Sequence, residues 1–472
     1  MFLILFGTFY LASNKNECNY SDMIRTVFFR RKKTVRVISK QLQNKNITKR
    51  LTMKNKVFYG WWMLAGMTIM YTATNGVAMY AFGVLRKLQA VQSPEFGLDP
   101  ATQSALPALL FMVVAFTSPV VGSLLDRYSP KVIISIGAVL AVVMTFSQQF
   151  MSSYNGLRVI YAFFAIAMSF AGIISFMFLI NRFFKKNIGL AAGILLLGSS
   201  LGSIIFPKIV AAAGDWRIAC NWLGLTAAVF LIAPLLLIKN SPEEMGTTQD
   251  GLPQNTEGSR GFLNYGLIAS QSISSVTEGI TLGEAIRSKS FYLVLVVTGA
   301  LWFCINGYIQ NHAFFMTDLG KDASQTAAVI GTFGMTAIIG KLVFGWLADK
   351  YERRLMMVGS IGLMLVAILL LKMCQANQAF VMPFAVVFGI GFGGAFSMIQ
   401  IWVADIYAGK NFGSILGVVT MVDTIAGSIG MIYLGSMRKT AGTFDGGFNV
   451  MLALCAIALV ATFLVKKPTE KA

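Results

Sequence analysis

Long apolar runs separated by short polar stretches are the main pattern of this 472-residue chain. A helix of about 20 apolar residues crosses the roughly 30 Å hydrocarbon layer of a bilayer, and backbone groups in lipid must bond within their own segment. Each run is therefore predicted to be one transmembrane helix. Twelve such runs follow Val57, near residues 58–85, 102–125, 131–150, 157–181, 188–212, 217–238, 290–315, 325–348, 355–374, 379–403, 411–436 and 446–465.

The longest polar stretch after residue 52, at 239–289, falls between the sixth and the seventh run. This position is typical of a linker between two halves of a membrane protein. We predict an all-α membrane protein of 12 transmembrane helices in two six-helix bundles. The N-terminal bundle is expected at 53–238, the cytoplasmic linker at 239–289, and the C-terminal bundle with a short cytoplasmic tail at 290–472.

Two internal matches indicate that the halves repeat each other. The segment Gly122–Tyr128 returns as Gly345–Tyr351 at an offset of 223 residues, and Lys186–Gly193 returns as Lys410–Gly417 at an offset of 224. Two matches at nearly one offset predict six helices in each half with the same orientation, as in the parallel repeats of many secondary transporters.

The first 52 residues differ from the rest because they carry 11 Lys/Arg against 2 acidic residues. One interpretation is a basic arm on an anionic membrane surface. The interpretation that we favour takes Met53 as the true start. Residues 1–52 are therefore predicted to be a non-native or disordered basic extension.

The net charge of +19 predicts orientation rather than a polyanionic partner, because the basic residues after position 52 lie mostly in short loops. If the N-terminus is inside, the inside loops from Asp126 onward and the tail carry 16 Lys/Arg, against 7 in the outside loops. We expect a multi-pass inner-membrane protein with both termini in the cytoplasm and no nucleic-acid partner.

The composition leaves little material for catalysis. Only 12% of residues are charged, against about 25% in soluble domains, and the chain holds one histidine and five scattered cysteines. No metal site, cofactor or nucleophile constellation is predicted, so the chain is not expected to be an enzyme. A phosphate-binding loop of the type G-x4-G-K-[ST] is absent from the sequence, so ion or solute gradients are expected to supply the energy.

The segment Gly122–Lys131 resembles the loop 2–3 signature of the major facilitator superfamily, and Gly345–Arg354 resembles its counterpart in the second half. Ser129 and Glu352 replace the usual glycine. Further motifs resemble the monocarboxylate transporter and oxalate:formate antiporter branch; they include Phe58–Trp62, Tyr80–Gly83, Arg182–Gly193 and Glu284–Phe291. The resemblance implies a secondary transporter.

The loop signature also has a physical interpretation. A carboxylate such as Asp126 at a helix–loop boundary can accept the free amides of a neighbouring helix and so hold one state closed. The alternative is ordinary loop charge that sets topology. The residues to which we assign gating are Gly122, Asp126, Arg127, Lys131, Gly345, Asp349, Arg353 and Arg354.

Two charges, Lys341 and Asp423, fall near the bilayer midplane, about 12 and 18 Å from the cytoplasmic ends of their helices. Such a charge costs roughly 2.5–3.5 kcal/mol on insertion scales and normally faces the protein interior. Their repeat counterparts are Ser118 and Ser199. A structural ion pair is one interpretation; because such pairs rarely stabilise, we favour a substrate or proton role.

The resemblance makes these roles more specific. Lys341 occupies the position at which the branch carries a substrate-binding Arg, four residues before Gly345, whereas the Asp of its monocarboxylate symporters is replaced by Ala337. The oxalate antiporter has a Lys where this chain has Asp423, so a dicarboxylate is disfavoured. Our hypothesis is that Lys341 binds a monocarboxylate and that Asp423 carries a proton or meets a substrate amine.

Weaker candidates lie in the same runs. His312 is either a proton group or a hydrogen-bonded structural residue. The polar residues that we expect to line the cavity besides Lys341 and Asp423 are Tyr80, Asn306, Gln310, His312 and Gln400.

We therefore predict a monomeric secondary active transporter of a small organic anion. It would work by alternating access in the lipid bilayer, with a symported proton or an exchanged counter-anion. The alternatives are transport of a drug, sugar or amino acid, and a non-transporting membrane sensor.

Overall fold

The computed structural model describes residues 58–97, 100–251, 280–409 and 411–466. The predicted extension at 1–52 lies outside these ranges. The division of the chain into segments 53–238, 239–289 and 290–472 stays a prediction.

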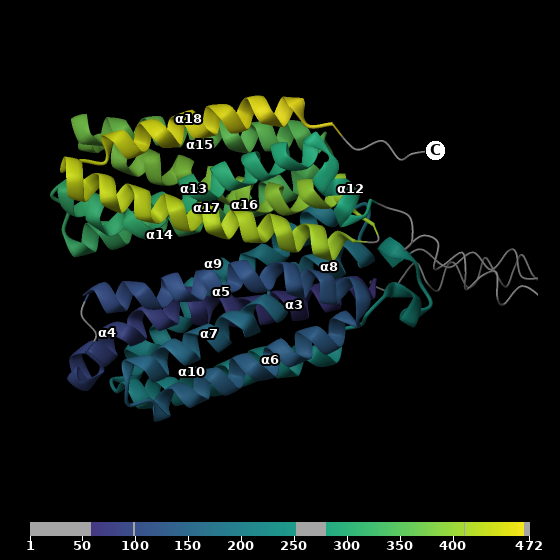
Figure 1. The fold of residues 1–472 in the computed structure, drawn as a ribbon, viewed down its shortest axis with the longest axis horizontal. Helices are drawn as coiled ribbons and strands as arrows, with labels where there is room; N and C mark the ends of the chain where they lie inside the picture. Colours follow the sequence, from purple (N-terminus) through teal and green to yellow (C-terminus); the bar gives the residue numbers. More distant parts are fainter. Residues whose placement is uncertain (1–57, 98–99, 252–279, 410, 467–472) are drawn as a thin grey trace, which may run out of the picture. The chain divides into compact units, whose positions relative to one another are not determined.

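Long helices account for nearly all of the described residues (Figure 1). Those before the linker are α3 (Tyr59–Asn75), the π-helix η1 (Gly76–Ala81), α4 (Phe82–Gln92), α5 (Pro100–Arg127), α6 (Pro130–Ser147), α7 (Tyr154–Phe170), α8 (Ile173–Phe183), α9 (Ile188–Ala213) and α10 (Trp216–Ile232). Helix α12 (Leu282–Arg287) lies inside the predicted linker, and α13 (Lys289–Asp318) begins at its last residue. The helices that follow are α14 (Ala323–Ala348), α15 (Arg353–Ala376), α16 (Val381–Tyr407), α17 (Phe412–Ala441) and α18 (Asp445–Leu464).

Eleven helical segments among the described residues are long and apolar enough to cross a membrane. The remaining predicted run, at 58–85, corresponds to Tyr59–Gln92, which is helical throughout but is divided by the π-helical turn into shorter α-helices. The predicted run at 58–85 therefore extends further than the apolar pattern indicated, because the polar end of α4 continues the helix.

The predicted helix near 157–181 is broken rather than continuous. Helix α7 ends at Phe170 and α8 begins at Ile173, with the intervening Gly172 in an extended conformation. The break coincides with a close approach of α6, because a Cβ placed on Gly137 would lie 2.6 Å from the amide nitrogen of Ala171. The Ser175 hydroxyl donates to the Phe170 carbonyl at 2.6 Å and satisfies an oxygen freed by the break.

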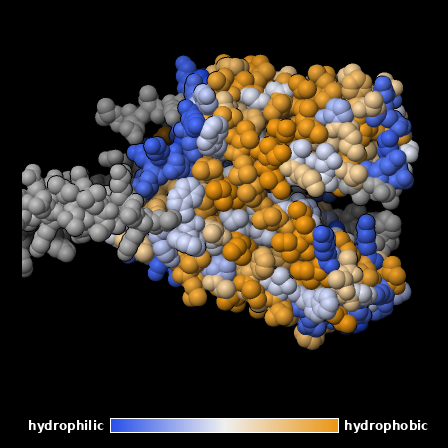
Figure 2. Space-filling view, turned by 180° about the vertical axis from the view of Figure 1, so that it is seen from behind, coloured by the Kyte–Doolittle hydropathy of each residue, from blue (hydrophilic) through white to orange (hydrophobic). Residues whose placement is uncertain are grey.

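On the face shown in Figure 2, apolar side chains cover the middle of the surface, and polar ones gather toward the helix ends. Large apolar side chains such as Trp62, Phe116 and Leu225 are exposed. An exposed apolar surface of this kind is unfavourable in water and is the expected surface against lipid tails.

Two helix crossings make the main contacts between the segments before and after the linker: α9 with α14, and α5 with α17. The first half of α9 packs against the second half of α14, and the first half of α17 packs against the second half of α5. We call the helix ends near residues 128–129, 184–187, 349–352 and 408–409 the linker end; they lie on the right of Figure 1. The two crossings start there and position the site.

Candidate functional site

The α9–α14 crossing begins with a glycine contact and a carboxylate. A Cβ placed on Gly345 would lie 2.6 Å from the Gly189 carbonyl oxygen, so only glycine permits this separation. The amides of Gly189 and Leu190 donate to the Asp349 carboxylate at 2.7 and 2.8 Å. The N-cap residue of α9, Asn187, makes no side-chain capping bond, so Asp349 supplies from α14 the cap that α9 lacks.

The environment of Asp349 affects its charge in two ways. Burial raises the pKa of the Asp349 carboxyl, while the amide hydrogen bonds from Leu190 and Gly189 and the nearby Arg353 oppose that rise. These amides favour the ionised form because they donate to it and lie at the positive end of α9.

The α5–α17 crossing repeats this arrangement. The Asp126 carboxylate accepts the amides of Gly413 and Ser414 at 2.9 and 2.8 Å and the Ser414 hydroxyl at 2.6 Å. The N-cap residue of α17, Asn411, again makes no side-chain capping bond. A Cβ on Gly417 would lie 2.5 Å from the Ser118 carbonyl oxygen, and one on Gly193 would lie 2.7 Å from that of Lys341. The two crossings are thus equivalent under the sequence repeat.

The basic residues of the loop signatures have different surroundings. Arg127 is exposed, and the backbone amide of Lys131 donates to the Asn240 side chain at 3.0 Å. Arg353 forms an ion pair with Asp405 at 2.6 Å, and Arg354 donates to the Val465 carbonyl oxygen.

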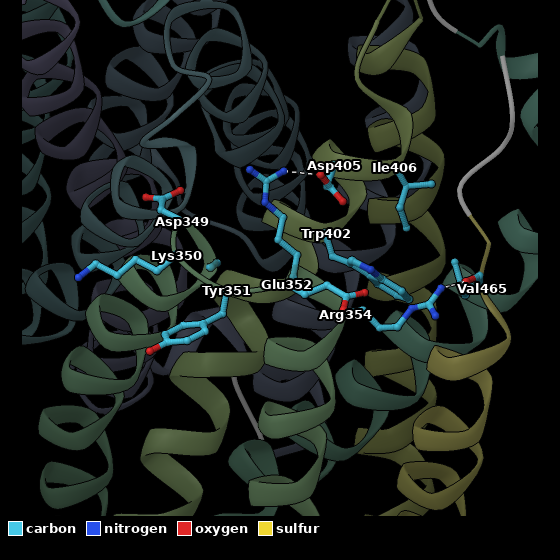
Figure 3. Close-up of a pocket in the computed structure, with 11 residues that line it drawn as sticks. Asp349, Lys350, Tyr351, Glu352, Arg354, Trp402, Asp405, Ile406 and Val465 are labelled. Atoms are coloured by element: carbon cyan, nitrogen blue, oxygen red, sulfur yellow. Dashed lines mark hydrogen bonds and ion pairs between the residues drawn. The ribbon is translucent and has the colours of Figure 1, made fainter.

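A hollow of about 510 Å³ lies at the linker end beside the second loop signature (Figure 3). Asp349, Trp402, Asp405 and Val465 line it, and Figure 3 shows Arg354 directed toward Val465. Lys341 and Asp423 are not among its lining residues. This hollow is therefore separate from the predicted substrate residues.

Lys341 is buried deeper along the α9–α14 crossing, with 1% of its surface exposed. Its ammonium group donates to the Leu196 carbonyl at 3.1 Å, to the Ser199 hydroxyl at 2.6 Å and to the Ser200 hydroxyl at 3.0 Å. The ammonium also lies 5.3 Å from the ring centroid of Phe396, a cation–π distance.

Asp423 on α17 is also buried, with 3% of its surface exposed, and neither carboxylate oxygen has a hydrogen-bond partner. The hydroxyl of Thr298 on α13 is likewise buried without a hydrogen-bond partner. One turn further along α13, the indole nitrogen of Trp302 is also without a hydrogen bond. Buried polar atoms without partners are rare in folded proteins, and their grouping here marks this region as a candidate site.

Lys341 and Asp423 do not pair with each other. The two ion pairs found within the described ranges are Arg353–Asp405 and Arg438–Asp318, both near helix ends. The interpretation of a structural ion pair between these two buried charges is therefore wrong.

The weaker candidates are dispersed. His312 and Tyr308 share a hydrogen bond of 2.5 Å, and the His312 ring lies 3.4 Å from the Thr326 carbonyl oxygen. Gln400 is buried with its side-chain oxygen unpartnered, whereas Tyr80 and Gln310 are exposed. Asn306 packs against Gly427 of α17. The structure gives no contact that gathers these five residues around Lys341.

The match to known families agrees with the fold and the repeated loop signatures. A family model described as Major Facilitator Superfamily matches residues 58–312 and 291–472. The chain belongs to the Major Facilitator Superfamily. It is therefore a multi-pass membrane protein that transports a small molecule, and it is not an enzyme.

Individual members of the superfamily resemble the chain at low identity. Agnestins efflux protein AgnL12 of Paecilomyces divaricatus is 24% identical over 320 residues, 66% of this chain and 65% of that protein. Monocarboxylate transporter 12 of Rattus norvegicus is 22% identical over 421 residues, 85% of this chain and 83% of that protein.

A solved structure extends the match to the fold. The proton:xylose symporter XylE bound to 6-bromo-6-deoxy-D-glucose superposes with a TM-score of 0.67 at 13% identity, covering 88% of this chain and 97% of that one. The predicted fold, an all-α membrane protein of the Major Facilitator type, is confirmed.

Sequence reasoning missed several polar residues of this Major Facilitator chain. Ser199 was noticed as the repeat counterpart of Asp423 but not as a partner of Lys341, and Ser200, Thr298 and Trp302 were not noticed. The sequence repeat could have pointed to the two serines. It places Ser199 at the same depth in the membrane as Asp423, which is also about the depth of Lys341.

Proposed function

We propose that this chain is a secondary transporter of a small, monocarboxylate-like organic anion. The observation that carries the proposal is the Lys341 ammonium, buried between two helices and bonded only to neutral oxygens. A buried cation without an anionic partner is costly, so its presence favours a role in binding an anion. The likeness to a protein named as a monocarboxylate transporter supports the same substrate class.

Asp423 supplies the second function that a coupled carrier needs. Its carboxylate is buried without a hydrogen-bond partner, so either a bound proton, which neutralises the group, or a cationic partner would offset the cost of burying it. We propose that Asp423 carries the symported proton or, for an amino-bearing substrate, meets the amine. Anion exchange would use Lys341 alone.

Asp126 and Asp349 are proposed to hold the linker end closed. Each carboxylate belongs to one segment and caps a helix of the other, so separating the helices at either crossing breaks at least two charge-assisted hydrogen bonds. We further propose that the linker end faces the cytoplasm and that the carrier lies in the inner membrane, with the substrate reaching Lys341 from the opposite side.

The proposal is tested by uptake into proteoliposomes of labelled formate, acetate, lactate, pyruvate and benzoate, with and without an imposed pH gradient. The wild type should take up at least one of them, and Lys341→Ala should abolish that uptake. Lys372→Ala is the matched control, because Lys372 lies on α15 and bonds to Asn449 away from the crossings. Uptake by Lys341→Ala at the wild-type rate would contradict the substrate assignment.

A neutral variant of Asp423 distinguishes its proposed role in proton coupling from the role of Lys341 in anion binding. Asp423→Asn should lose stimulation by the pH gradient but keep exchange of internal for external anion, because exchange does not require a titrating carboxyl.

If no monocarboxylate is transported, efflux of amphipathic compounds is the next assay, as the likeness to an efflux protein suggests.

A further inference from the structure

The acceptors around Lys341 all come from α9, across the crossing. An ammonium group has three N–H donors, and here they find Leu196, Ser199 and Ser200, which lie within five residues of one another. The lysine is thus fully satisfied and shielded, but only by neutral oxygens. These three bonds tie α14 to α9 near the middle of both helices.

A carboxylate would replace these partners favourably. The bonds from the ammonium to the serine hydroxyls are already charge-assisted, but a carboxylate adds the attraction of an opposite charge to its hydrogen bonds and neutralises the lysine. A carboxylate that reaches the ammonium therefore competes with the serine hydroxyls for the same N–H groups. Binding and the α9–α14 contact cannot both keep all three donors.

We propose that Leu196, Ser199 and Ser200 stand in for the substrate carboxylate in the empty carrier, and that an arriving carboxylate takes Lys341 from them. The inference rests on the proposed function, in which Lys341 binds that carboxylate. Its consequence is that binding loosens the α9–α14 crossing, which links occupation of the site to movement of the helices. Ligands shift such an equilibrium only through contacts that differ between states, and these bonds are such contacts.

The other crossing lacks this feature at the equivalent position. Ser118 corresponds to Lys341 under the repeat, and its hydroxyl donates to Val114 of its own helix at 2.6 Å. At this depth the α5 residue therefore makes its side-chain bond within one helix. The ligand-sensitive bonds belong to the α9–α14 crossing, and the two otherwise equivalent crossings become functionally different.

The test is the double variant Ser199→Ala/Ser200→Ala in the full-length protein, with Ser203→Ala as the control. Ser203 lies on the same helix and donates to the Ser200 carbonyl rather than to Lys341. Equilibrium binding of the five labelled monocarboxylates measures affinity. Hydrogen–deuterium exchange of α9 and α14 peptides, without and with ligand, measures the crossing.

If the serines compete with the substrate, the double variant binds the carboxylate at least about tenfold more tightly, because the ligand no longer displaces two hydrogen bonds to the charged ammonium. Its ligand-free exchange in α9 and α14 should also rise toward that of the ligand-bound wild type. Weaker binding would overturn the inference, because the serines would then be substrate ligands. Wild-type affinity together with wild-type exchange would overturn it as well.

Failure of the inference is distinguishable from failure of the proposed function. If the wild type binds none of the five anions, the proposed function fails, yet ligand-free exchange still reports whether the serines hold α14 to α9. Should the double variant not fold, the single variants carry the same expectation, each binding at least about threefold more tightly than the wild type. Ser199→Ala should have the larger effect, because its bond to Lys341 is shorter.

Discussion

At the scale of single residues, the two capping carboxylates differ from ordinary helix caps because they come from another helix. The N-cap residues of α9 and α17 are asparagines without a capping bond, and Asp349 and Asp126 take over that role. The capping hydrogen bonds therefore stabilise the contact between two helices that are far apart in sequence, in addition to the capped helix itself. A capping change should act on the conformational equilibrium as well as on the stability of one helix.

We predict that Asp126→Ala weakens closure at the linker end by about 0.5–2 kcal/mol, the usual cost of losing a cap. The measurement is the distance between spin labels at positions 128 and 351, exposed sites in the two loop signatures. A longer-distance population should appear or grow in the variant.

The control for this change is Asp215→Ala. Asp215 caps its own helix, α10, by accepting the amides of Arg217 and Ile218. Its loss should lower thermal stability but leave the label distance as in the wild type. An unchanged distance in Asp126→Ala would show that this carboxylate does not control closure.

At the scale of helices, the crossings depend on glycines that allow backbones to touch. A Cβ at Gly193 or Gly417 would overlap a carbonyl oxygen of the facing helix. We predict that Gly193→Ala and Gly417→Ala each destabilise the closed crossing by about 1–3 kcal/mol, the range for overpacked sites, and slow transport. Thermal unfolding and uptake in proteoliposomes measure the two effects.

Gly362→Ala is the matched comparison. Gly362 lies inside α15, and a Cβ there meets no atom within 4 Å. Because alanine is the better helix former, this variant should be neutral or slightly stabilising. Equal damage by all three substitutions would indicate that helix flexibility, not close approach, explains the glycines.

The sequence predicted the positions of the helices better than the contacts between them. Apolar runs predict where helices lie, and the repeat offset predicts which residues share a depth. Neither encodes rotation about the helix axis, so the apolar pattern alone could not reveal that Lys341 faces Ser199. The break at Gly172 also escaped prediction, because it depends on the approach of α6 at Gly137.

At the scale of the whole molecule, the two caps restrain the same separation of helices. Because Asp126 and Asp349 lie at different crossings without shared partners, their contributions should add. The double variant Asp126→Ala/Asp349→Ala should shift the open-to-closed ratio by the product of the single shifts. A double variant no different from the stronger single variant would mean that one crossing alone determines closure. The same label pair measures all three proteins.

The substrate residues were only partly predictable at this scale. The depth of Lys341 and Asp423 followed from counting residues along two helices. The lack of a bond between them, and the neutral partners of Lys341, depend on how helices from different segments cross. The family resemblance suggested an anion because it placed Lys341 beside a known motif, whereas the orphaned oxygens of Asp423 are visible only in three dimensions.

The π-helical turn at Gly76–Ala81 has a consequence for how the first membrane segment packs. A π-turn holds one residue more than an α-turn, which rotates the following side chains by about 100° relative to an uninterrupted helix. Helix α3 contacts α9, while beyond the turn the Phe82 ring packs on Tyr161 and Phe164 of α7. If one residue were deleted from the turn, the side chains of α3 and of Phe82 could no longer face α9 and α7 at the same time.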